Sequence, residues 1–522
     1  MREGFHIVDW KERPKERVEV KNCRSAYDDV LRPLAEQQIK MELEEGRYCI
    51  VSDPPSIVSA IGVLPKPEGQ GVRLIHDCSR PAGASVNDYA PLERVSFQTF
   101  DDAVKLLTPG CYLAKVDLKN AFRSVKVHPS NRDALGLKWV FAGDKEATYL
   151  IDTCMPFGAR RAPSIFHRIS QSIKRMMRRR GFDCIVVYLD DFLVVAKTLE
   201  ECSKIQAILI DLLRKLGFQI NWKKVEGPAT CLTFLGVEID TVAGTLQLPE
   251  RKLNELKEVL QSFTRRKRAS RKQLQSLAGK LNWACQVIRG GRTFLRRIID
   301  SYVGGGDAGG KRRLSREFYA DVRWWLEALQ RFHGKAVFPH AKPIVDAHVD
   351  SSKQAAGLFF RGDWQYVDWS RDWPIMSDLH INYKEVLSIA LSLKRWAHLW
   401  RNSKVIVYTD SQVARAIINR GSCHHPGVMT VLRQLFWITV DMNIELQAVF
   451  IPGKTNDIPD AISRIHQPGQ WRRLEGLLRE WWSARDVHGV QYRLINHISK
   501  DTLFHLFYRP FGCDSVATST SA

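Results

Sequence analysis

Hydrophobic and polar residues in the first half of the chain form short apolar runs that alternate with stretches of helical spacing. The runs are rich in β-branched side chains and predict strands at residues 58–65, 72–77, 114–118, 185–196 and 233–239. A helical stretch follows Pro163. Earlier, residues 25–46 carry apolar side chains at helical intervals and end at Gly46, a helix stop signal. The pattern predicts an α+β domain preceded by a helical entry segment.

The pattern changes after Leu248, where strand signals give way to helical periodicity and a block of positive charge at residues 265–272. Residues 304–313 have the composition of a flexible loop, and a Trp-rich helix is predicted after them. From about Pro343 to Arg464, strands and helices mix again and predict a second α/β domain.

Chain length and composition are those of a folded, multidomain protein that binds a polyanion. The chain has 522 residues, of which 44% are hydrophobic and 10% aromatic, so we expect about three to five subdomains. Lys and Arg total 78 against 57 Asp and Glu, and the formal net charge is +21. This excess favours nucleic acid as the partner, because bound phosphates release counterions. A ribosome-associated or merely soluble basic protein is the alternative.

Cysteine spacing and hydropathy bear on the cellular environment. The eleven cysteines are scattered without a C-x-x-C pair or a Cys/His cluster, which argues against a disulfide framework or a structural zinc. There is no run of about eighteen apolar residues, and residues 1–21 are too charged for a secretory signal. We therefore expect a soluble intracellular protein without a membrane partner, in the cytoplasm or the nucleus.

Three aspartates form the first candidate catalytic group. Asp190 and Asp191 lie between two buried strand patterns, which predicts a tight acidic turn. Adjacent carboxylates there repel each other and require a cation. Asp117 ends another apolar strand and supplies the third carboxylate that a site with two Mg²⁺ ions needs.

These residues also carry a resemblance to a known family. YLDD within apolar strands, VDLKNAF, MPFGARRAPSIFHR and TFLGVEI occur in the order found in reverse transcriptases of long-terminal-repeat and related retroelements. The resemblance covers roughly residues 50–300 as fingers, palm and thumb. It implies that Asp117, Asp190 and Asp191 are metal ligands, with Asp191 the least indispensable.

The same resemblance implies roles for residues around the three aspartates. Lys66 and Arg73 match the cationic fingers residues that hold the incoming triphosphate, and Phe122 matches the aromatic gate against a ribose 2′-hydroxyl. Alternatively, Phe122 is a core residue and the two cations are merely solvated. Met155, Pro156, Phe157 and Gly158 match the turn under the nascent base pair, although some relatives have Gln at the position of Phe157. Phe234, Leu235 and Gly236 resemble the primer-grip hairpin, and a plain β-turn is the alternative.

Four acidic residues downstream form the second candidate group. They are Asp350, Glu385, Asp410 and Asp460, and together they resemble the set that binds two metal ions in ribonuclease H. Asp346 and Asp457 are neighbouring alternatives, but the residues around Asp350 and Asp460 match the motif better. The loop before Asp460 lacks the histidine found in cellular and retroviral relatives, so RNA cleavage would be slower. A generic α/β domain with scattered acids is the alternative.

The resemblance implies an α+β right-hand polymerase with fingers, palm and thumb, followed by an α/β RNase H-like domain. We expect an N-terminal extension at 1–46, fingers and palm at 47–245, a helical thumb and connecting region at 246–336, RNase H at 337–466 and a C-terminal extension at 467–522. The implied activities are RNA-directed DNA synthesis and hydrolysis of RNA in the hybrid. The cofactor is Mg²⁺, with Mn²⁺ as an alternative. The partners are an RNA template, a DNA primer, the RNA–DNA hybrid, deoxynucleoside triphosphates and other element-encoded proteins.

The helical region and its surroundings suggest a subclass. Residues 274–300 and DVRWWLEAL look like the tyrosine-recombinase retrotransposons of the DIRS type more than like Ty3 or retroviral elements. Residues 491–522 resemble the segment that trails RNase H in such polyproteins, so we expect either a fragment or a product ending there. The competing hypotheses are a decayed or domesticated copy that only binds hybrid, a polymerase with inert RNase H, and an RNA-templated RNA polymerase, which Phe122 disfavours.

Overall fold

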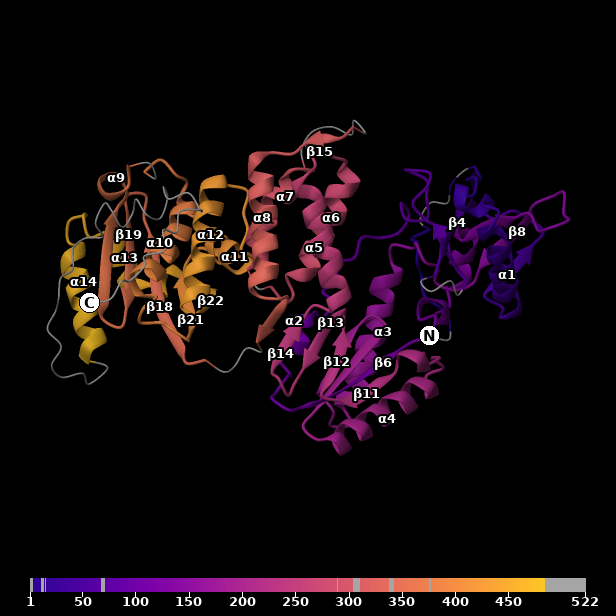
Figure 1. The fold of residues 1–522 in the computed structure, drawn as a ribbon, viewed down its shortest axis with the longest axis horizontal. Coiled ribbons are helices and arrows are strands. Elements are labelled where there is room, and N and C mark those ends of the chain that lie inside the picture. Colours follow the sequence, from indigo (N-terminus) through magenta and orange to yellow (C-terminus); the bar gives the residue numbers. More distant parts are fainter. Residues whose placement is uncertain are drawn as a thin grey trace. The chain divides into compact units, whose positions relative to one another are not determined.

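The computed structural model divides the chain into two compact units, Met1–Leu246 and Gln247–Ala522 (Figure 1). The structure describes residues 3–10, 14, 16–66, 71–288, 290–303, 310–337, 342–374 and 377–483. The predicted loop at 304–313 lies mostly outside these residues, and the C-terminal resemblance at 491–522 lies wholly outside them.

The first unit is centred on a four-stranded antiparallel sheet. Its strand order is β11 (Glu226–Ala229), β6 (Tyr112–Asp117), β10 (Asp191–Ala196) and β9 (Ile185–Tyr188). Two amphipathic helices, α3 (Ala162–Arg178) and α4 (Leu199–Lys215), pack against it and complete the largest part of the core. The strands at 114–118 and 185–196 are thus confirmed.

A second sheet of short strands lies earlier in the same unit. Its order is β1 (Val18–Glu19), β3 (Ile57–Val58), β7 (Gly136–Trp139), β8 (Thr148–Asp152) and β2 (Tyr48–Val51). The hairpin of β4 (Ala60–Pro65) and β5 (Val72–Asp77) and helix α1 (Leu31–Glu44) form a small core with it. The segment that we treat as an N-terminal extension is therefore packed into the unit, because α1 belongs to this core and Ile7 and Val8 belong to the larger one.

The remaining elements of the first unit are short. A hairpin of β12 and β13 is followed by β14, and small helices connect the strands. Their bounds are η1 (Arg24–Tyr27), α2 (Phe100–Val104), η3 (Phe122–Ser124), η4 (Pro129–Ala134), η5 (Trp222–Lys224), β12 (Cys231–Phe234), β13 (Val237–Asp240) and β14 (Thr245–Gln247).

The second unit begins with the helices that the sequence predicts after Leu248. Buried Leu and Phe residues of α5 and α8 hold the bundle together, and Asp321 of α8 is paired inside it with Arg297 at 3.2 Å and Arg433 at 3.5 Å. The elements are α5 (Glu250–Thr264), β15 (Arg268–Ala269), α6 (Arg271–Ala284), η6 (Gly291–Phe294), α7 (Arg296–Asp300), β16 (Arg312–Arg313), α8 (Arg316–Arg331) and β17 (Lys335–Val337).

A five-stranded mixed sheet follows, in the order β20-β19-β18-β21-β22. β18 pairs with β19 antiparallel and with β21 parallel. The elements are β18 (Ile344–Ser351), β19 (Ala355–Phe360), β20 (Asp363–Asp368), α9 (Trp369–Asp372), α10 (Ile381–Trp396), β21 (Lys404–Thr409), α11 (Gln412–Arg420), α12 (Pro426–Asp441), β22 (Glu445–Phe450), η8 (Gly453–Thr455), α13 (Asp457–Ser463) and α14 (Gln470–Ser483).

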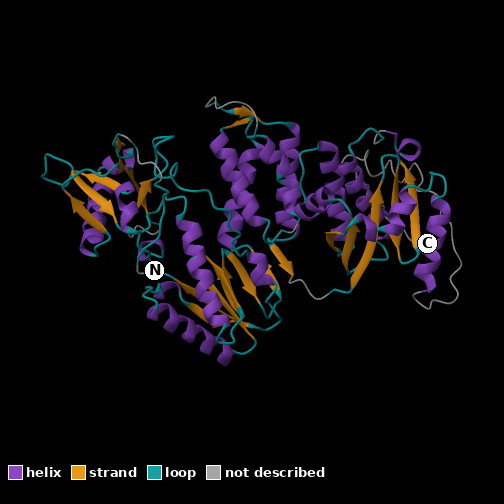
Figure 2. Ribbon diagram, turned by 180° about the vertical axis from the view of Figure 1, so that it is seen from behind, coloured by secondary structure: helices purple, strands orange, loops and turns teal. Residues whose placement is uncertain are grey.

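Helices cover both faces of this sheet, as the fully buried strand β19 shows (Figure 2). Alternate side chains of a strand point to opposite faces. Ala356, Leu358 and Phe360 join the core that includes α10, whereas Phe359 joins the core formed by α13 and α14. The strands and helices predicted between residues 343 and 464 are confirmed. Within the described ranges, no helix combines the length and the apolar character needed to cross a membrane.

Candidate active sites

Strand pairing brings the first three aspartates to one end of the first unit's central sheet. In the antiparallel ladder, Asp191 of β10 lies directly opposite Asp117 of β6. β9 and β10 form a hairpin whose turn residues are Leu189 and Asp190, and Leu189 has φ +54°. The predicted acidic turn is present, and it places Asp190 beside the facing pair.

Burial and neighbouring charges raise the pKa of both Asp190 and Asp191. Burial, followed by the charges of Asp190 and Asp117, raises the pKa of Asp191 to about 7. Burial is also the largest cause of the raised pKa of Asp190, to which the charge of Asp117 adds. Each ionised carboxylate therefore makes the next one harder to ionise, and a divalent cation would relieve this cost.

Two residues that the sequence patterns did not indicate contact Asp117. The side-chain amide of Asn221 donates a hydrogen bond to its carboxylate at 2.7 Å, and Lys224 Nζ lies 3.2 Å from the other oxygen. Both come from the short η5 region, which has no apolar periodicity. The backbone supports this arrangement, since the N–H of Asn221 donates to the carbonyl of Asp117 at 2.9 Å.

Some of the predicted nucleotide-binding residues lie near the end of the sheet that carries the three aspartates. The centres of the Phe122 and Phe157 rings are 5.6 Å apart, and the guanidinium carbon of Arg73 lies 5.3 Å from the centre of the Phe157 ring. Arg73 also favours the ionised form of Asp190 and so opposes its raised pKa. Gly158 has φ +128° next to Phe157. Lys66 is exposed beyond the end of β4, and its backbone N–H donates to Gly71 at 3.0 Å.

The predicted primer-grip residues form the turn between β12 and β13. Leu235 has φ +49° and Gly236 has φ +83°, the conformation of a two-residue hairpin turn. Phe234 is fully buried. Leu235 and Gly236 are partly exposed, as are Thr233 and Glu238 on the flanking strands. Their assignment to the primer stays a prediction.

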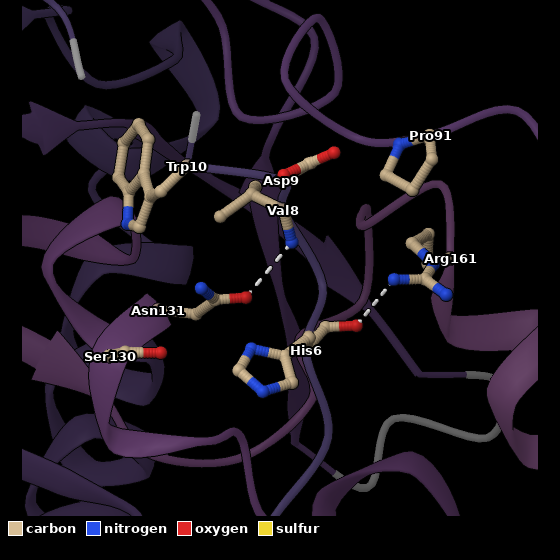
Figure 3. Close-up of a pocket in the computed structure, with 8 residues that line it drawn as sticks. All are labelled: His6, Val8, Asp9, Trp10, Pro91, Ser130, Asn131 and Arg161. Atoms are coloured by element: carbon tan, nitrogen blue, oxygen red, sulfur yellow. Dashed lines mark hydrogen bonds between the residues drawn. The ribbon is translucent and has the colours of Figure 1, made fainter. Parts of the chain in front are cut away.

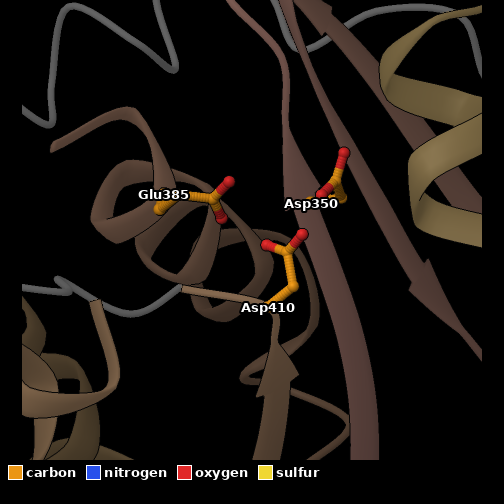
Figure 4. A group of neighbouring side chains, drawn as sticks. All are labelled: Asp350, Glu385 and Asp410. Carbon is orange, nitrogen blue, oxygen red and sulfur yellow. The ribbon is translucent and has the colours of Figure 1, made fainter. Parts of the chain in front are cut away.

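The second unit brings together three of its four predicted acidic residues (Figure 4). Asp350 lies near the end of β18, Glu385 in the first turns of α10 and Asp410 just after β21. One carboxylate oxygen of each lies within 4.8 Å of the others, so the group could hold a metal ion. Asp346, the alternative to Asp350, is exposed on the same strand and outside this group.

Burial dominates the electrostatics of this second group. It raises the pKa of Asp350 to about 6, although the hydroxyl of Ser463 donates a 2.6 Å hydrogen bond to that carboxylate. The pKa of Glu385 is raised well above its usual range by burial and by the charges of Asp350 and Asp410. The pKa of Asp410 is also raised, by burial and then by the charge of Asp460. Three converging carboxyl groups with raised pKa values, two of them buried, suit a hard divalent cation.

Asp460 is held differently from the other three. One of its oxygens accepts a 2.7 Å hydrogen bond from Arg464, and the other accepts a 2.8 Å bond from Arg473 of α14. Arg473 also lies 3.6 Å from Asp457, the alternative residue. The loop before them approaches the site, because a Cβ atom at Gly453 would lie 3.2 Å from a carboxylate oxygen of Asp410.

An open cavity of about 400 Å³ lies elsewhere in the first unit (Figure 3). The N-terminal segment forms one side, held by hydrogen bonds from Arg161 to the His6 carbonyl at 2.7 Å and from the Val8 N–H to Asn131 at 3.0 Å. The residues that line it are His6, Val8, Asp9, Trp10, Pro91, Ser130, Asn131 and Arg161. The set includes no predicted site residue.

Sequence comparison gives these sites a family context. Residues 73–239 match the family described as reverse transcriptase (RNA-dependent DNA polymerase). Over 481 residues, the chain is 25% identical to a retrovirus-related Pol polyprotein from the Drosophila melanogaster transposon opus, covering 86% of this chain and 43% of that protein. Over 365 residues, it is 22% identical to the genome polyprotein of Petunia vein clearing virus, covering 68% of this chain and 15% of the polyprotein. The chain thus spans less than half the length of either relative.

Comparison with solved structures concerns the fold. A foamy viral protease-reverse transcriptase, solved in complex with an RNA/DNA hybrid, has a TM-score of 0.53 and 16% identity, covering 85% of this chain and 56% of that one. Likeness at this level of identity shows architecture alone. It confirms the expected fold class, a right-hand polymerase followed by an α/β RNase H-like domain.

Proposed function

We propose that this chain, whose residues 73–239 match the reverse transcriptase family, copies RNA into DNA and hydrolyses the RNA strand of the resulting hybrid. The observation that carries the proposal is the pairing of Asp117 with Asp191, beside the Asp190 turn, inside the family-matched segment. The converging carboxylates of Asp350, Glu385 and Asp410 support the second activity.

The two acidic groups would bind two Mg²⁺ ions each, with Mn²⁺ as an alternative. Bound ions would activate the primer 3′-hydroxyl and stabilise the leaving pyrophosphate at the first site, and would direct water at an RNA phosphodiester at the second. Asp117, Asp190 and Asp191 are the proposed ligands at the first site. Asp350, Glu385, Asp410 and Asp460 are those at the second, where Asp460 must first exchange its arginine partners for the metal.

The residues next to the first site would bind and select the nucleotide. Lys66 and Arg73 are exposed cations on one hairpin and suit the triphosphate. Phe122 is half-buried against Phe157, so its ring can meet the sugar and exclude a ribose 2′-hydroxyl. Gly158 would let the backbone approach the base pair closely.

The substrates and setting follow from this proposal. The partners would be an RNA template, a DNA primer, their hybrid and deoxynucleoside triphosphates, in the cytoplasm or the nucleus. The polyprotein relatives support a mobile genetic element or a related virus as the source. The tyrosine-recombinase subclass of the DIRS type stays our proposal from residues 274–300 and DVRWWLEAL.

The test is extension of a labelled DNA primer on a labelled RNA template with Mg²⁺ and deoxynucleotides, so that RNA cleavage is followed in the same tube. We expect Asp190→Asn to abolish extension and leave RNA cleavage, and Asp410→Asn to do the reverse. Loss of both activities from either change would refute two separate sites. A wild-type protein that binds the hybrid without either reaction would indicate a decayed copy that only binds.

A further inference from the structure

We infer that Arg123, the residue after the proposed gate, is a positioning residue that sets how strictly the polymerase excludes ribonucleotides. The inference rests on the proposed function and adds a residue that neither the motifs nor the comparisons single out. Arg123 is buried, with a relative exposure of 6%, whereas Phe122 beside it in η3 is half-buried and faces Phe157. A charged side chain is almost never buried without partners.

The partners of Arg123 are two buried carboxylates from different elements. Its Nη1 donates to both oxygens of Asp152, at the end of β8, at 2.8 and 2.7 Å. Its Nε and Nη2 donate to one oxygen of Glu42, near the end of α1, at 3.2 and 2.8 Å. These charge-assisted bonds fix the plane of the guanidinium, which a lysine ammonium could not match.

The guanidinium also reaches the turn that carries Phe157. Nη1 lies 3.4 Å from the carbonyl oxygens of both Cys154 and Met155, just before that turn. The Met155 N–H donates to the Val125 carbonyl at 2.9 Å, so a backbone bond joins the two chain segments two residues after Arg123. The Arg123 side chain therefore adds a second link between the two segments, directly after Phe122 and just before Phe157.

This arrangement bears on sugar selection, because the Phe122 ring excludes a ribose 2′-hydroxyl only if the ring is held in place. The centres of the Phe122 and Phe157 rings lie 5.6 Å apart, and Phe122 is partly exposed. Without the guanidinium, the two segments keep the Met155–Val125 backbone bond but lose the side-chain link next to Phe122, so the Phe122 ring gains freedom to move. Misplacement of about 1 Å in an active site can change rates by about a hundredfold.

The experiment measures kcat and KM for incorporation of one deoxynucleotide and of the matching ribonucleotide, using the full chain on an RNA template. For Arg123→Met we expect the preference for the deoxynucleotide to fall at least about tenfold, with a lower KM for the ribonucleotide as its signature. General damage to the fold would raise KM or lower kcat for both substrates. Arg123→Lys keeps the charge but offers one nitrogen in place of the three that bind Asp152 and Glu42, and it should recover only part of the preference.

Arg47→Met is the matched control. Arg47 donates to the same Glu42 carboxylate, at 2.7 Å, while the 154–155 carbonyls accept from Arg123. The Arg47→Met variant should keep the preference for the deoxynucleotide within about twofold of the wild type, since Arg123 still contacts the Cys154 and Met155 carbonyls. An equal loss in Arg47→Met would overturn the inference.

Asp152→Asn keeps the test decisive if Arg123→Met does not fold, because it removes one negative charge at nearly constant volume. It should shift the preference in the same direction by a smaller factor. An unchanged preference in Asp152→Asn, or equal losses for both nucleotides in every variant, would overturn the role of Arg123 alone. Absence of deoxynucleotide extension by the folded wild type would instead refute the proposed function, and the inference with it.

Discussion

Gly158 lies at the position where the backbone of the Phe157 turn passes closest to β5. Its φ of +128° is strained for any other residue, and a methyl group there would overlap the carbonyl oxygen of His76. The neighbouring contact is itself structural, because the His76 N–H donates to the Phe157 carbonyl at 3.0 Å. A side chain at this position must therefore separate β5 from the turn.

We predict that Gly158→Ala lowers DNA synthesis at least about tenfold, because the shift displaces Phe157 and the nucleotide pocket. Gly181→Ala is the control, since Gly181 has φ +90° but open space around it. It should cost about 1 kcal/mol of stability and leave the rate unchanged. Primer extension and thermal unfolding of both variants check this, and equal loss of activity would contradict it.

Asp191 makes the first acidic group, at the end of the first unit's central sheet, sensitive to pH. Its pKa of about 7 means that the metal-free folded chain holds a proton that the unfolded chain, in which Asp has its ordinary pKa of 3.8, releases at lower pH. In the metal-free protein, its contribution to stability is therefore lost as pH rises from about 4 through about 7. A bound cation must displace this proton.

We therefore predict that the Mg²⁺ concentration for half-maximal extension rises by up to about tenfold per pH unit below pH 7. Titrations of Mg²⁺ at pH 6, 7 and 8 measure this directly. Asp191→Asn, where activity is retained, should flatten the dependence. The same half-maximal concentration at pH 6 and pH 8 would contradict the prediction.

At the scale of elements, α14 reaches back to the second site. Leu474 and Leu478 pack with Phe359 and Ile462, and this packing places Arg473 against Asp460. Arg473 competes with any metal ion for that carboxylate. The helix is thus built into the site although it follows the last motif residue.

We predict that Arg473→Gln lowers the Mg²⁺ requirement for RNA cleavage several-fold and leaves primer extension unchanged, because Asp460 loses a competing partner. Arg479→Gln is the control, since Arg479 lies on the same helix and pairs with Glu475 instead. Metal titrations of cleavage compare the two variants. An unchanged or higher Mg²⁺ requirement in Arg473→Gln would show that Arg473 does not compete with the ion.

At the scale of the whole molecule, the net charge of +21 predicts binding dominated by phosphate contacts. Affinity for an RNA–DNA hybrid should fall by at least about a hundredfold between 50 and 200 mM salt. The exposed cations Lys267 and Arg268, between α5 and α6, and Lys272, in the first turn of α6, are the proposed contributors. Their triple change to Gln should make the logarithmic salt slope shallower by up to about three.

The control for this prediction removes the same charge elsewhere. Lys40, Lys105 and Lys215 each pair with an acidic residue on their own helix or next to it. Changing all three to Gln should leave the slope nearly unchanged. Binding curves at four salt concentrations distinguish the two triple variants, and equal slopes would remove the 265–272 segment from the interface.

Sequence by itself determined the elements that carry the acidic residues. Asp117, Asp190 and Asp410 follow or end apolar runs, and Glu385 lies in a helical repeat, so local periodicity and turn chemistry placed them correctly. The order of motifs also predicted the fold class. These signals are local, since each depends on residues within one strand, helix or turn.

Tertiary structure alone decided which side chains meet. Asn221 and Lys224 on Asp117, Arg473 on Asp460, and Arg123 between Glu42 and Asp152 come from segments 13 to 107 residues apart, and no periodicity connects them. The short strands of the β1-β3-β7-β8-β2 sheet were missed for the same reason. Two to five residues are too few to show a pattern, and their pairing becomes favourable only when the rest of the chain has closed the loops between them.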